Sequence, residues 1–469
     1  MNFAPFEALA LAGSLAFLVF IFLERIALEH ARSKIGFVIH VNGTRGKTET
    51  TRLTAAALRA SGIRTLAKTT GTLPRLIMPD GSERPFFRCG APNVREQRRL
   101  VFLAARMGVD ALVVECMAVS EDAQAASTAF LTPDLLVATN ARLDHVAELG
   151  SPEEAAAVFA RGIPAGGRVV TADPRLGAAL EPEALKRGAV FVLAAPLEGA
   201  GSVFPENAGA ALAAALAAGA RSEEAIAGMR SHTPDLGAYA LRALEREGGG
   251  IVYVADALAA NDPLSTGLIL GKALASIAGT GGPSRLALLL ATRADRPDRS
   301  LAFAEWVARG MAARRAASAS AGGGAGPADG DVAARQAEIS RGDVVRAAAS
   351  EWGGLNPKPP HRIMPDASCA YAFDEILVVG PLPRGPAMVL ARGFSSNPEE
   401  PAGKIERHKT MSEAIAALRK LPEGCLVLAA GNWKGFGPAL AAAAPPIRAS
   451  VAAKAGFFQK LAGGIRGVG

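Results

Sequence analysis

Short apolar runs alternate with longer alanine-rich or amphipathic stretches through the first half of the chain. Each run has the length of a buried strand, and most of the stretches between runs are long enough for a helix. The predicted strands are residues 37–41, 65–68, 111–115, 135–139, 169–171 and 190–193. Strands that alternate with helices are typical of a parallel sheet covered on both faces, so we expect an α/β domain here.

A second series of apolar runs follows a glycine-rich hinge at residues 247–250. Its predicted strands are residues 251–254, 286–290, 376–379 and 426–429. Residues 312–330 are mostly Ala, Gly, Ser and Arg, which indicates a flexible insertion that we place near residues 312–370. We therefore expect an N-terminal segment over residues 1–34, a central domain over residues 35–248 and a C-terminal domain over residues 249–469.

The N-terminal segment contains the longest apolar run, residues 8–23, which carries no charge. A helix needs about 20 apolar residues to cross a bilayer, with about 17 as the lower limit, so the run predicts a short transmembrane helix. No basic residue precedes it, which disfavours a signal peptide, and a buried helix is the alternative. Arg25, Arg32 and Lys34 follow the run and place the rest of a single-pass protein in the cytoplasm.

Composition narrows the class of protein. Half of the 469 residues are hydrophobic and a fifth are charged, which excludes wholesale disorder. The net charge of +7 is spread along the chain, so it favours small anions such as nucleotides, and we expect no nucleic-acid partner. The four cysteines are far apart and form no C-x-x-C pair, which indicates a reducing compartment without a disulfide framework or a zinc site.

The strongest chemical signal is a glycine-containing loop, residues 42–48 (NGTRGKT), between a predicted strand and a predicted helix. Glycines let backbone N–H groups approach phosphate oxygens, and the N-terminus of a helix attracts anions. In a phosphate-binding loop, Lys47 reaches the β- and γ-phosphates and the Thr48 hydroxyl coordinates Mg²⁺. Val41 replaces the first glycine of the strict motif, but the strand–turn–helix context still predicts nucleotide binding.

Polar residues also end the next predicted strands of this domain. Glu115 ends the strand at residues 111–115, and Asn140, Asp144 and His145 follow the strand at residues 135–139. Each group alone is typical of a cap or an ion pair. Because ligands of open parallel sheets bind at the carboxyl ends of strands, we expect the groups to lie together. Carboxylate and imidazole ligands suit a divalent ion that bridges ATP and a substrate.

These motifs together resemble the Mur ligase superfamily, and more closely the PgsB/CapB family of poly-γ-glutamate synthase subunits, which also begins with a membrane-anchoring helix. The resemblance covers most of residues 35–310 and the C-terminal strands. It rests on residues 41–48, 68–72 (KTTGT), 115–118 (ECMA), 140–145, 259–262 (AAND), 293–299 (RADRPDR) and 431–432 (GN).

The resemblance implies an ATP-dependent amide ligase in which a carboxylate attacks the γ-phosphate, an acyl phosphate forms, and an amine displaces phosphate. It implies Lys47, Glu115 and His145 as catalytic residues, with Thr48, Glu115 and His145 at the Mg²⁺. Asn207 would contact adenine, although it is also a candidate helix cap. The residues implied to cradle ATP are Gly43, Thr44, Arg45, Gly46, Lys47 and Thr48.

The resemblance also implies a smaller, Rossmann-like C-terminal domain that closes over ATP and supplies the amino-acid site. Arg293, Arg296 and Arg299 are candidates to clamp a substrate carboxylate, because arginine binds carboxylates with two parallel hydrogen bonds. Asp295 and Asp298 are interleaved with them, so a solvated Arg/Asp network is the alternative.

The predicted substrates are glutamate and the growing poly-γ-glutamate chain, and the predicted partners are small integral-membrane subunits of the PgsC/CapC and PgsA/CapA types. One alternative is a folate or murein ligase of the same superfamily. The murein-type members carry a lysine after the Asp-His motif, whereas residues 153–160 contain none, and this disfavours that alternative. The other is a phosphate-loop NTPase that powers polymer export.

Overall fold

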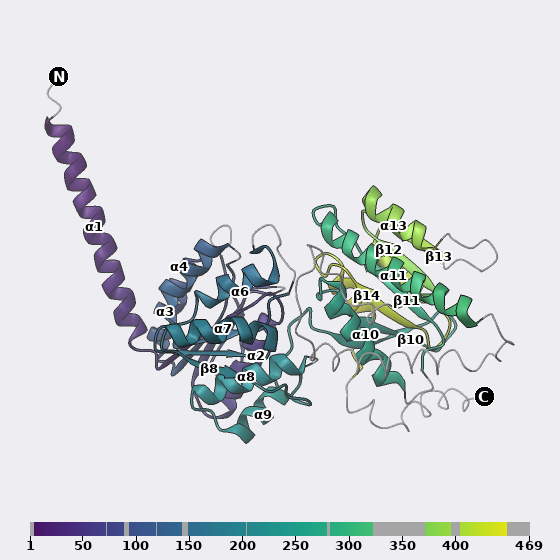
Figure 1. The fold of residues 1–469 in the computed structure, drawn as a ribbon, viewed down its shortest axis with the longest axis horizontal. Helices are drawn as coiled ribbons and strands as arrows, with labels where there is room; N and C mark the ends of the chain where they lie inside the picture. Colours follow the sequence, from purple (N-terminus) through teal and green to yellow (C-terminus); the bar gives the residue numbers. More distant parts are fainter. Residues whose placement is uncertain are drawn as a thin grey trace. The chain divides into compact units, whose positions relative to one another are not determined.

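The computed structural model describes residues 4–71, 73–88, 93–118, 120–142, 149–202, 204–278, 282–321, 371–394 and 404–447. The chain divides into two compact units, Met1–Leu236 and Gly237–Gly469. Each unit has its own sheet flanked by helices (Figure 1).

The sheet of the first unit has the strand order β4-β3-β2-β5-β1-β6-β7-β8 in the described part of the chain. Neighbouring strands from β2 to β8 are parallel, whereas β3 and β4 form an antiparallel edge. The strands are β1 (Phe37–Asn42), β2 (Thr65–Thr69), β3 (Arg75–Ile77), β4 (Glu83–Pro85), β5 (Ala111–Glu115), β6 (Leu135–Ala138), β7 (Arg168–Thr171) and β8 (Val190–Leu193).

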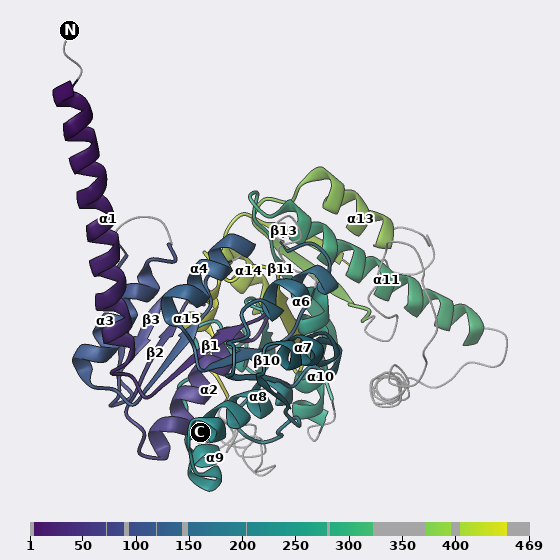
Figure 2. The ribbon, with the colours of Figure 1, turned by 60° about the vertical axis from the view of Figure 1, so that its left-hand side comes forward.

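Every strand predicted for the first series is therefore confirmed, and so is the α/β fold class. The β3–β4 hairpin was not predicted, because three-residue strands are too short to show a period of two. Figure 2 labels β1, β2 and β3 in this sheet, where β3 lies beside β2 and β5 separates β2 from β1.

Helices cover both faces of this sheet. Ile39 and Val41 of β1 pack on one face of the sheet, in the core beneath α2, α8 and α9. Val38 packs on the opposite face, against α3 and the end of α1. This alternation explains why the parallel strands are apolar throughout. The helices are α2 (Lys47–Ala60), α3 (Glu96–Met107), α4 (Glu121–Leu131), α6 (Pro152–Ala160), α7 (Pro174–Lys186), α8 (Pro205–Ala217) and α9 (Ser222–Arg230).

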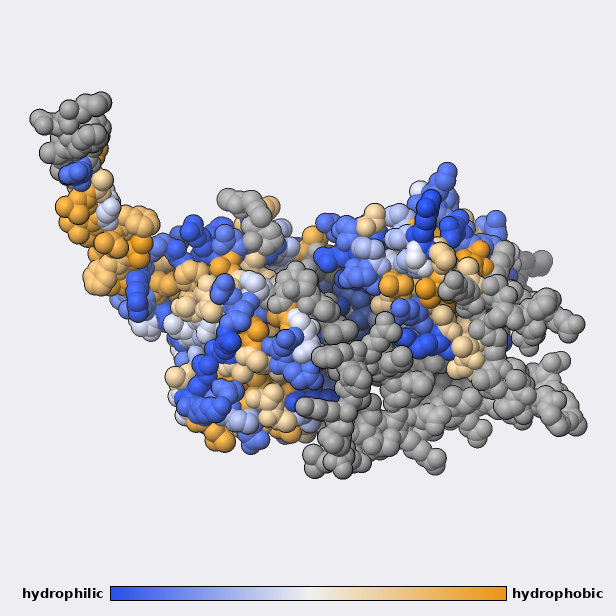
Figure 3. All heavy atoms as spheres, turned by 45° about the horizontal axis from the view of Figure 1, so that its top comes forward, coloured by the Kyte–Doolittle hydropathy of each residue, from blue (hydrophilic) through white to orange (hydrophobic). Residues whose placement is uncertain are grey.

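The predicted N-terminal helix is present as α1 (Ala4–Arg32), and its segment Leu9–Arg32 is long and apolar enough to cross a membrane. Near an N-terminus a signal sequence has the same properties. The side chains of residues 9–23 are exposed, which overturns the alternative of a buried helix, and Figure 3 shows this apolar surface. At the other end of α1, Arg32 Nη2 lies 2.6 Å from Asp134 Oδ2, which also accepts the Val38 N–H.

The sheet of the second unit has the order β13-β12-β11-β14-β10-β9 among the described strands, with β9 antiparallel to β10 and the other pairs parallel. Its strands are β9 (Ala240–Glu245), β10 (Ile251–Asp256), β11 (Leu286–Ala291), β12 (Glu375–Val379), β13 (Lys404–His408) and β14 (Leu426–Ala430). Its helices are α10 (Pro263–Ile277), α11 (Pro297–Ala321), α13 (Arg384–Phe394), α14 (Met411–Leu418) and α15 (Gly437–Ala443).

All predicted strands of the second series are confirmed, whereas the two edge strands β9 and β13 were not predicted because charged residues interrupt their apolar pattern. On β9, the buried Arg242 donates to Asp256 on β10 at 2.9 Å. Helix α11 continues to Ala321, so the first part of the segment expected as an insertion is helical, and residues 322–370 lie outside the described part.

One buried group in the first unit makes its stability dependent on pH. His40 on β1 is 1% exposed, its Nε2 lies 3.2 Å from Ser127 Oγ, and burial lowers the pKa of His40 to about 4 from 6.5. In the unfolded chain, His40 is therefore protonated below about pH 6.5, whereas in the folded chain it stays neutral down to about pH 4.

We predict that the free energy of unfolding falls by about 2 kcal/mol between pH 7 and pH 5, because the shift in the His40 pKa opposes folding throughout that range. Urea denaturation of the chain at the two pH values measures the change. His40→Asn should remove most of this dependence, and an unchanged slope in that variant would contradict the prediction.

Candidate functional site

The predicted phosphate-binding loop connects the end of β1 to the first residue of α2. Gly43 and Gly46 have φ angles of +125° and +81°, which favour glycine. A Cβ atom at Gly46 would lie 2.5 Å from Asn207 Oδ1, so the loop has no room for a side chain there. The strand–turn–helix arrangement predicted from the sequence is confirmed.

The loop is held in place by the two residues that follow β6, Thr139 and Asn140. The backbone carbonyl of Asn140 accepts the Thr44 N–H at 2.9 Å, and Asn140 Oδ1 accepts hydrogen bonds from Thr44 Oγ1 and Arg45 N at 2.7 and 3.1 Å. Thr139 Oγ1 donates to the Arg45 carbonyl at 2.5 Å. Asn140 therefore supports the loop itself, a role that the sequence did not indicate.

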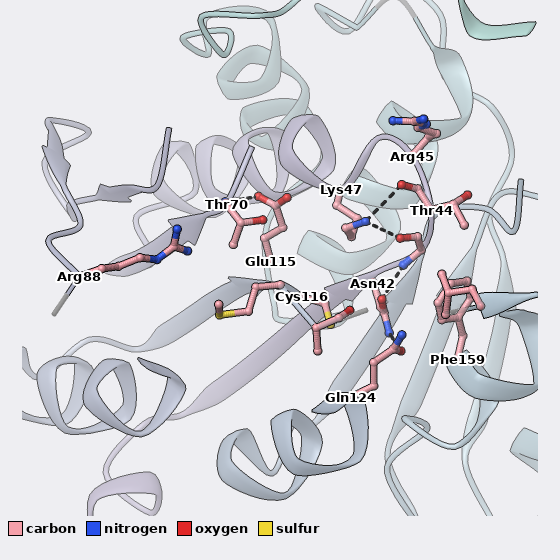
Figure 4. Close-up of a pocket in the computed structure, with 14 residues that line it drawn as sticks. Asn42, Thr44, Arg45, Lys47, Thr70, Arg88, Glu115, Cys116, Gln124 and Phe159 are labelled. Carbon is pink, nitrogen blue, oxygen red and sulfur yellow. Dashed lines mark hydrogen bonds between the residues drawn. The ribbon is translucent and has the colours of Figure 1, made fainter. Parts of the chain in front are cut away.

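A cavity of about 300 Å³ opens beside the loop at the carboxyl edge of the sheet (Figure 4). The loop contributes Gly43, Thr44, Arg45 and Lys47 to its wall, and β5 contributes Glu115. Other lining residues come from β1, from the chain after β2, β4 and β5, and from α4 and α6. They include Asn42, Thr70, Arg88, Cys116, Met117, Gln124 and Phe159.

Glu115 connects three elements around this cavity. Its Oε1 accepts a hydrogen bond from Thr48 Oγ1 at 2.9 Å, and its Oε2 accepts the Thr70 N–H at 2.5 Å. The side chain is only 3% exposed, so these donors hold a buried carboxylate in a fixed position. Thr70 belongs to the motif at residues 68–72, and the sequence did not predict its contact with Glu115.

Lys47 lies on the same side of the cavity and folds over the loop. Its Nζ donates to the carbonyl oxygens of Gly43 and Thr44 at 2.5 and 3.2 Å. Figure 4 shows the amine beside these carbonyl groups, within the space bounded by the loop and Glu115. The structure thus brings Lys47, Thr48 and Glu115 together. The sequence predicted that these three residues and His145 share one site.

His145, the remaining residue predicted for this site, lies in residues 143–148, outside the part that the structure describes. Among the described residues no cluster of three or more His, Cys, Asp and Glu side chains is found. The hydroxyl of Thr48 and the carboxylate of Glu115 are nevertheless hard oxygen donors beside the cavity, which is the chemistry that Mg²⁺ prefers. These residues therefore fit a divalent ion, and the role of His145 stays a prediction.

Asn207 lies in the first turn of α8, with its amide against Gly46. Its Nδ2 donates to Glu49 Oε2 at 2.7 Å, and the residue is 5% exposed. The helix cap is Phe204, so the alternative that Asn207 is the N-cap is wrong. Contact of Asn207 with adenine stays a prediction.

Arg293 and Arg296 belong to the second unit. The guanidinium of Arg293 donates from Nε and Nη2 to the two carboxylate oxygens of Asp295, at 2.9 and 2.5 Å. For Arg293 this is the Arg/Asp network given as the alternative, and a clamp for substrate stays a prediction. Arg299 instead reaches the edge of the sheet, where it donates to Asn261 Oδ1 and Asn432 Oδ1, each at 2.7 Å.

Comparison with known proteins identifies relatives along much of the chain. Residues 241–349 match the family model described as the poly-gamma-glutamate synthase CapB C-terminal domain. The chain is 34% identical to PGA synthase CapB of Bacillus subtilis, over 57% of this chain and 70% of the relative. It is 32% identical to the capsule biosynthesis protein CapB of Bacillus anthracis, over 57% of this chain and 59% of that protein.

Solved structures with the same fold are more distant in sequence. E. coli FolC in complex with ADP gives a TM-score of 0.56 at 15% identity, covering 91% of this chain and 96% of that one. The bifunctional folylpolyglutamate synthase/dihydrofolate synthase of Yersinia pestis, complexed with AMPPNP and Mn ion, gives 0.53 at 15% identity, covering 89% and 91%. The likeness shows a shared fold, and the sequence identity to the Bacillus subtilis relative shows that the chain belongs to the poly-γ-glutamate synthase CapB family of ligases.

Proposed function

We propose that this chain forms γ-glutamyl amide bonds at the expense of ATP and so extends poly-γ-glutamate at the cytoplasmic face of the membrane. The observation that carries the proposal is the convergence of Lys47, Thr48 and Glu115 beside a glycine loop and a cavity. Membership of the CapB family supports the choice of glutamate as the substrate.

The loop binds the triphosphate of ATP in this proposal. Backbone N–H groups of residues 43–48 and the N-terminus of α2 attract phosphate oxygens. Lys47 Nζ, which donates to two loop carbonyls in the structure, turns to the β- and γ-phosphates. Two proteins of the same fold are complexed with ADP and with AMPPNP, which supports a nucleotide as a ligand of this fold.

Thr48 and Glu115, with His145, hold the divalent metal, which we propose is Mg²⁺. When bound, the ion neutralises the charge of the phosphates. Glu115 is kept in position by the Thr70 N–H, so its carboxylate needs little rearrangement. The Mn ion in the Yersinia pestis structure supports a divalent metal for this fold.

The proposed reaction has two steps. A carboxylate oxygen of the acceptor attacks the γ-phosphorus and the bond from phosphorus to the ADP oxygen breaks, giving an acyl phosphate and ADP. The amine nitrogen of glutamate then attacks the acyl carbon, the bond from carbon to the phosphate oxygen breaks, and the nitrogen loses a proton. The task of the protein is to position these groups and to stabilise their charge.

The apolar helix α1 anchors the enzyme in this proposal, with Arg25, Arg32 and Lys34 on the cytoplasmic side. The anchor places the site beside the proposed integral-membrane subunits of the PgsC/CapC and PgsA/CapA types, which would take up the polymer. Its exposed apolar surface is the observation that favours a membrane location over a free enzyme.

We predict that Lys47→Ala and Glu115→Gln each lower glutamate-dependent release of ADP by at least about 100-fold, because each removes a group that stabilises the transferred phosphoryl. The assay uses membranes supplied with ATP, Mg²⁺ and glutamate, and His145→Ala should lose activity as well. Lys186→Ala, at an exposed lysine on α7, is the matched control and should keep full activity.

The same assay separates the competing functions. Release of ADP that needs both an acceptor and glutamate supports the ligase, whereas equal release without glutamate would indicate an NTPase that drives export. Activity only with a folate or a murein precursor would indicate another ligase of the superfamily.

We also predict that removal of residues 1–23 shifts the chain from the membrane fraction to the soluble fraction while it keeps glutamate-dependent activity. The contact between Arg32 and Asp134 remains in the shortened chain, so the first unit should stay folded. Fractionation followed by the ADP assay measures both effects. Mass spectrometry of the full chain from membranes should detect its N-terminal peptide, and a cleaved N-terminus would show that α1 is a signal sequence.

A further inference from the structure

A second charged cluster, formed by Lys68, Arg88 and Glu96, reaches the cavity through Arg88. Glu96, in the first turn of α3, is 6% exposed and accepts a hydrogen bond from Arg88 Nε at 2.7 Å. Its other oxygen lies 3.3 Å from Lys68 Nζ on β2. Two cationic side chains thus share one carboxylate, which leaves a formal surplus of one positive charge in the cluster.

Lys68 is the most deeply buried cationic side chain of this cluster. It is 0% exposed, and its Nζ lies 5.5 Å from the centre of the Phe86 ring. Burial lowers the pKa of Lys68, and the carboxylates of Glu96 and Glu115 act in the opposite direction. Because a buried ammonium needs a partner, Lys68 fixes the position of Glu96, and Glu96 in turn holds Arg88.

Arg88 is the member of the cluster that faces the cavity. It lines the cavity with Thr70 and Glu115, and Figure 4 shows its guanidinium pointing toward these two residues, with Lys47 on the far side of Glu115. Its Nε donates to Glu96, and neither Nη atom has a hydrogen-bond or ion-pair partner among the described residues. A pair of Nη atoms is the fork that matches a carboxylate.

We propose that Arg88 binds the non-reacting carboxylate of the terminal glutamyl unit of the acceptor chain, and that Glu96 and Lys68 act as positioning residues for its guanidinium. This inference rests on the proposed function. The terminal glutamyl unit carries an α- and a γ-carboxylate, only one of which is activated in each cycle. A cation opposite the phosphate-binding loop holds one carboxylate and directs the other to the γ-phosphate, so Arg88 decides which amide linkage forms.

The test compares Arg88→Gln and Arg88→Lys with Arg84→Gln, a matched control at an exposed arginine on β4. All are assayed in the full chain in membranes. We expect Arg88→Gln to raise KM for the acceptor about 10- to 100-fold, the loss of a bidentate charged contact, with KM for ATP unchanged. Arg88→Lys should recover part of this loss, and the control should behave as the unmodified chain.

The linkage of the product provides a second readout, which a merely structural role for Arg88 would not change. We expect Arg88→Gln to give a mixture of α- and γ-linked product by nuclear magnetic resonance, against γ-linked product from the control. Purely γ-linked product together with an unchanged KM for the acceptor would overturn the proposal. A rise in KM for ATP alone would also overturn it, because Arg88 would then contact phosphate.

Binding without turnover distinguishes failure of this inference from failure of the proposed function. A γ-linked glutamate trimer is titrated into the full chain in detergent by calorimetry. Weaker binding by at least about 10-fold in Arg88→Gln supports the inference even if the unmodified chain forms no amide bond. Equal binding by the Arg88→Gln and Arg84→Gln variants would overturn the inference while leaving a ligase activity intact.

Discussion

The buried carboxylate of Glu115 is the group on which the arrangement of the site depends. It ends β5, and the parallel register that pairs Val41 with Glu115 brings it beside the end of β1. There it accepts hydrogen bonds from Thr48, in the first turn of α2, and from the Thr70 N–H after β2. One carboxylate thus joins the ends of two strands to the start of the helix that follows the glycine loop. Because it is buried, its position is set by these donors rather than by water.

The charges around Glu115 are distributed on two sides of the cavity. The loop and Lys47 form one cationic side, and Arg88, supported by Glu96 and Lys68, forms the other. A polyanionic nucleotide and an anionic acceptor repel each other. Positive charge beside each of the two reactants offsets this repulsion. The arrangement therefore suits the joining of two anions, and the hydrogen bonds that fix it already exist in the folded chain.

The N-terminal helix, which we propose as the membrane anchor, is attached directly to the sheet of the first unit. Its apolar side chains up to Leu23 are exposed, whereas its last turn contacts the first unit through Arg32 and Asp134. Asp134 also accepts the Val38 N–H at the start of β1, the strand that leads into the glycine loop. The helix that we propose as the anchor and the loop that we propose as the nucleotide site are therefore connected by one short strand.

The sequence by itself determined those features whose signals are local. Apolar runs predicted the central strands, the two glycines and Lys47 predicted the loop, and the uncharged run at residues 8–23 predicted α1. Only the tertiary structure decided which distant residues meet, because strand order and register are set by packing across the whole sheet: the Thr70 contact with Glu115 and the support of the loop by Asn140 depend on them. The same holds for Arg88, which follows a hairpin too short to leave a periodic signal and is held at the cavity by Glu96. Local spacing fixes the elements of this chain, and long-range pairing fixes its site.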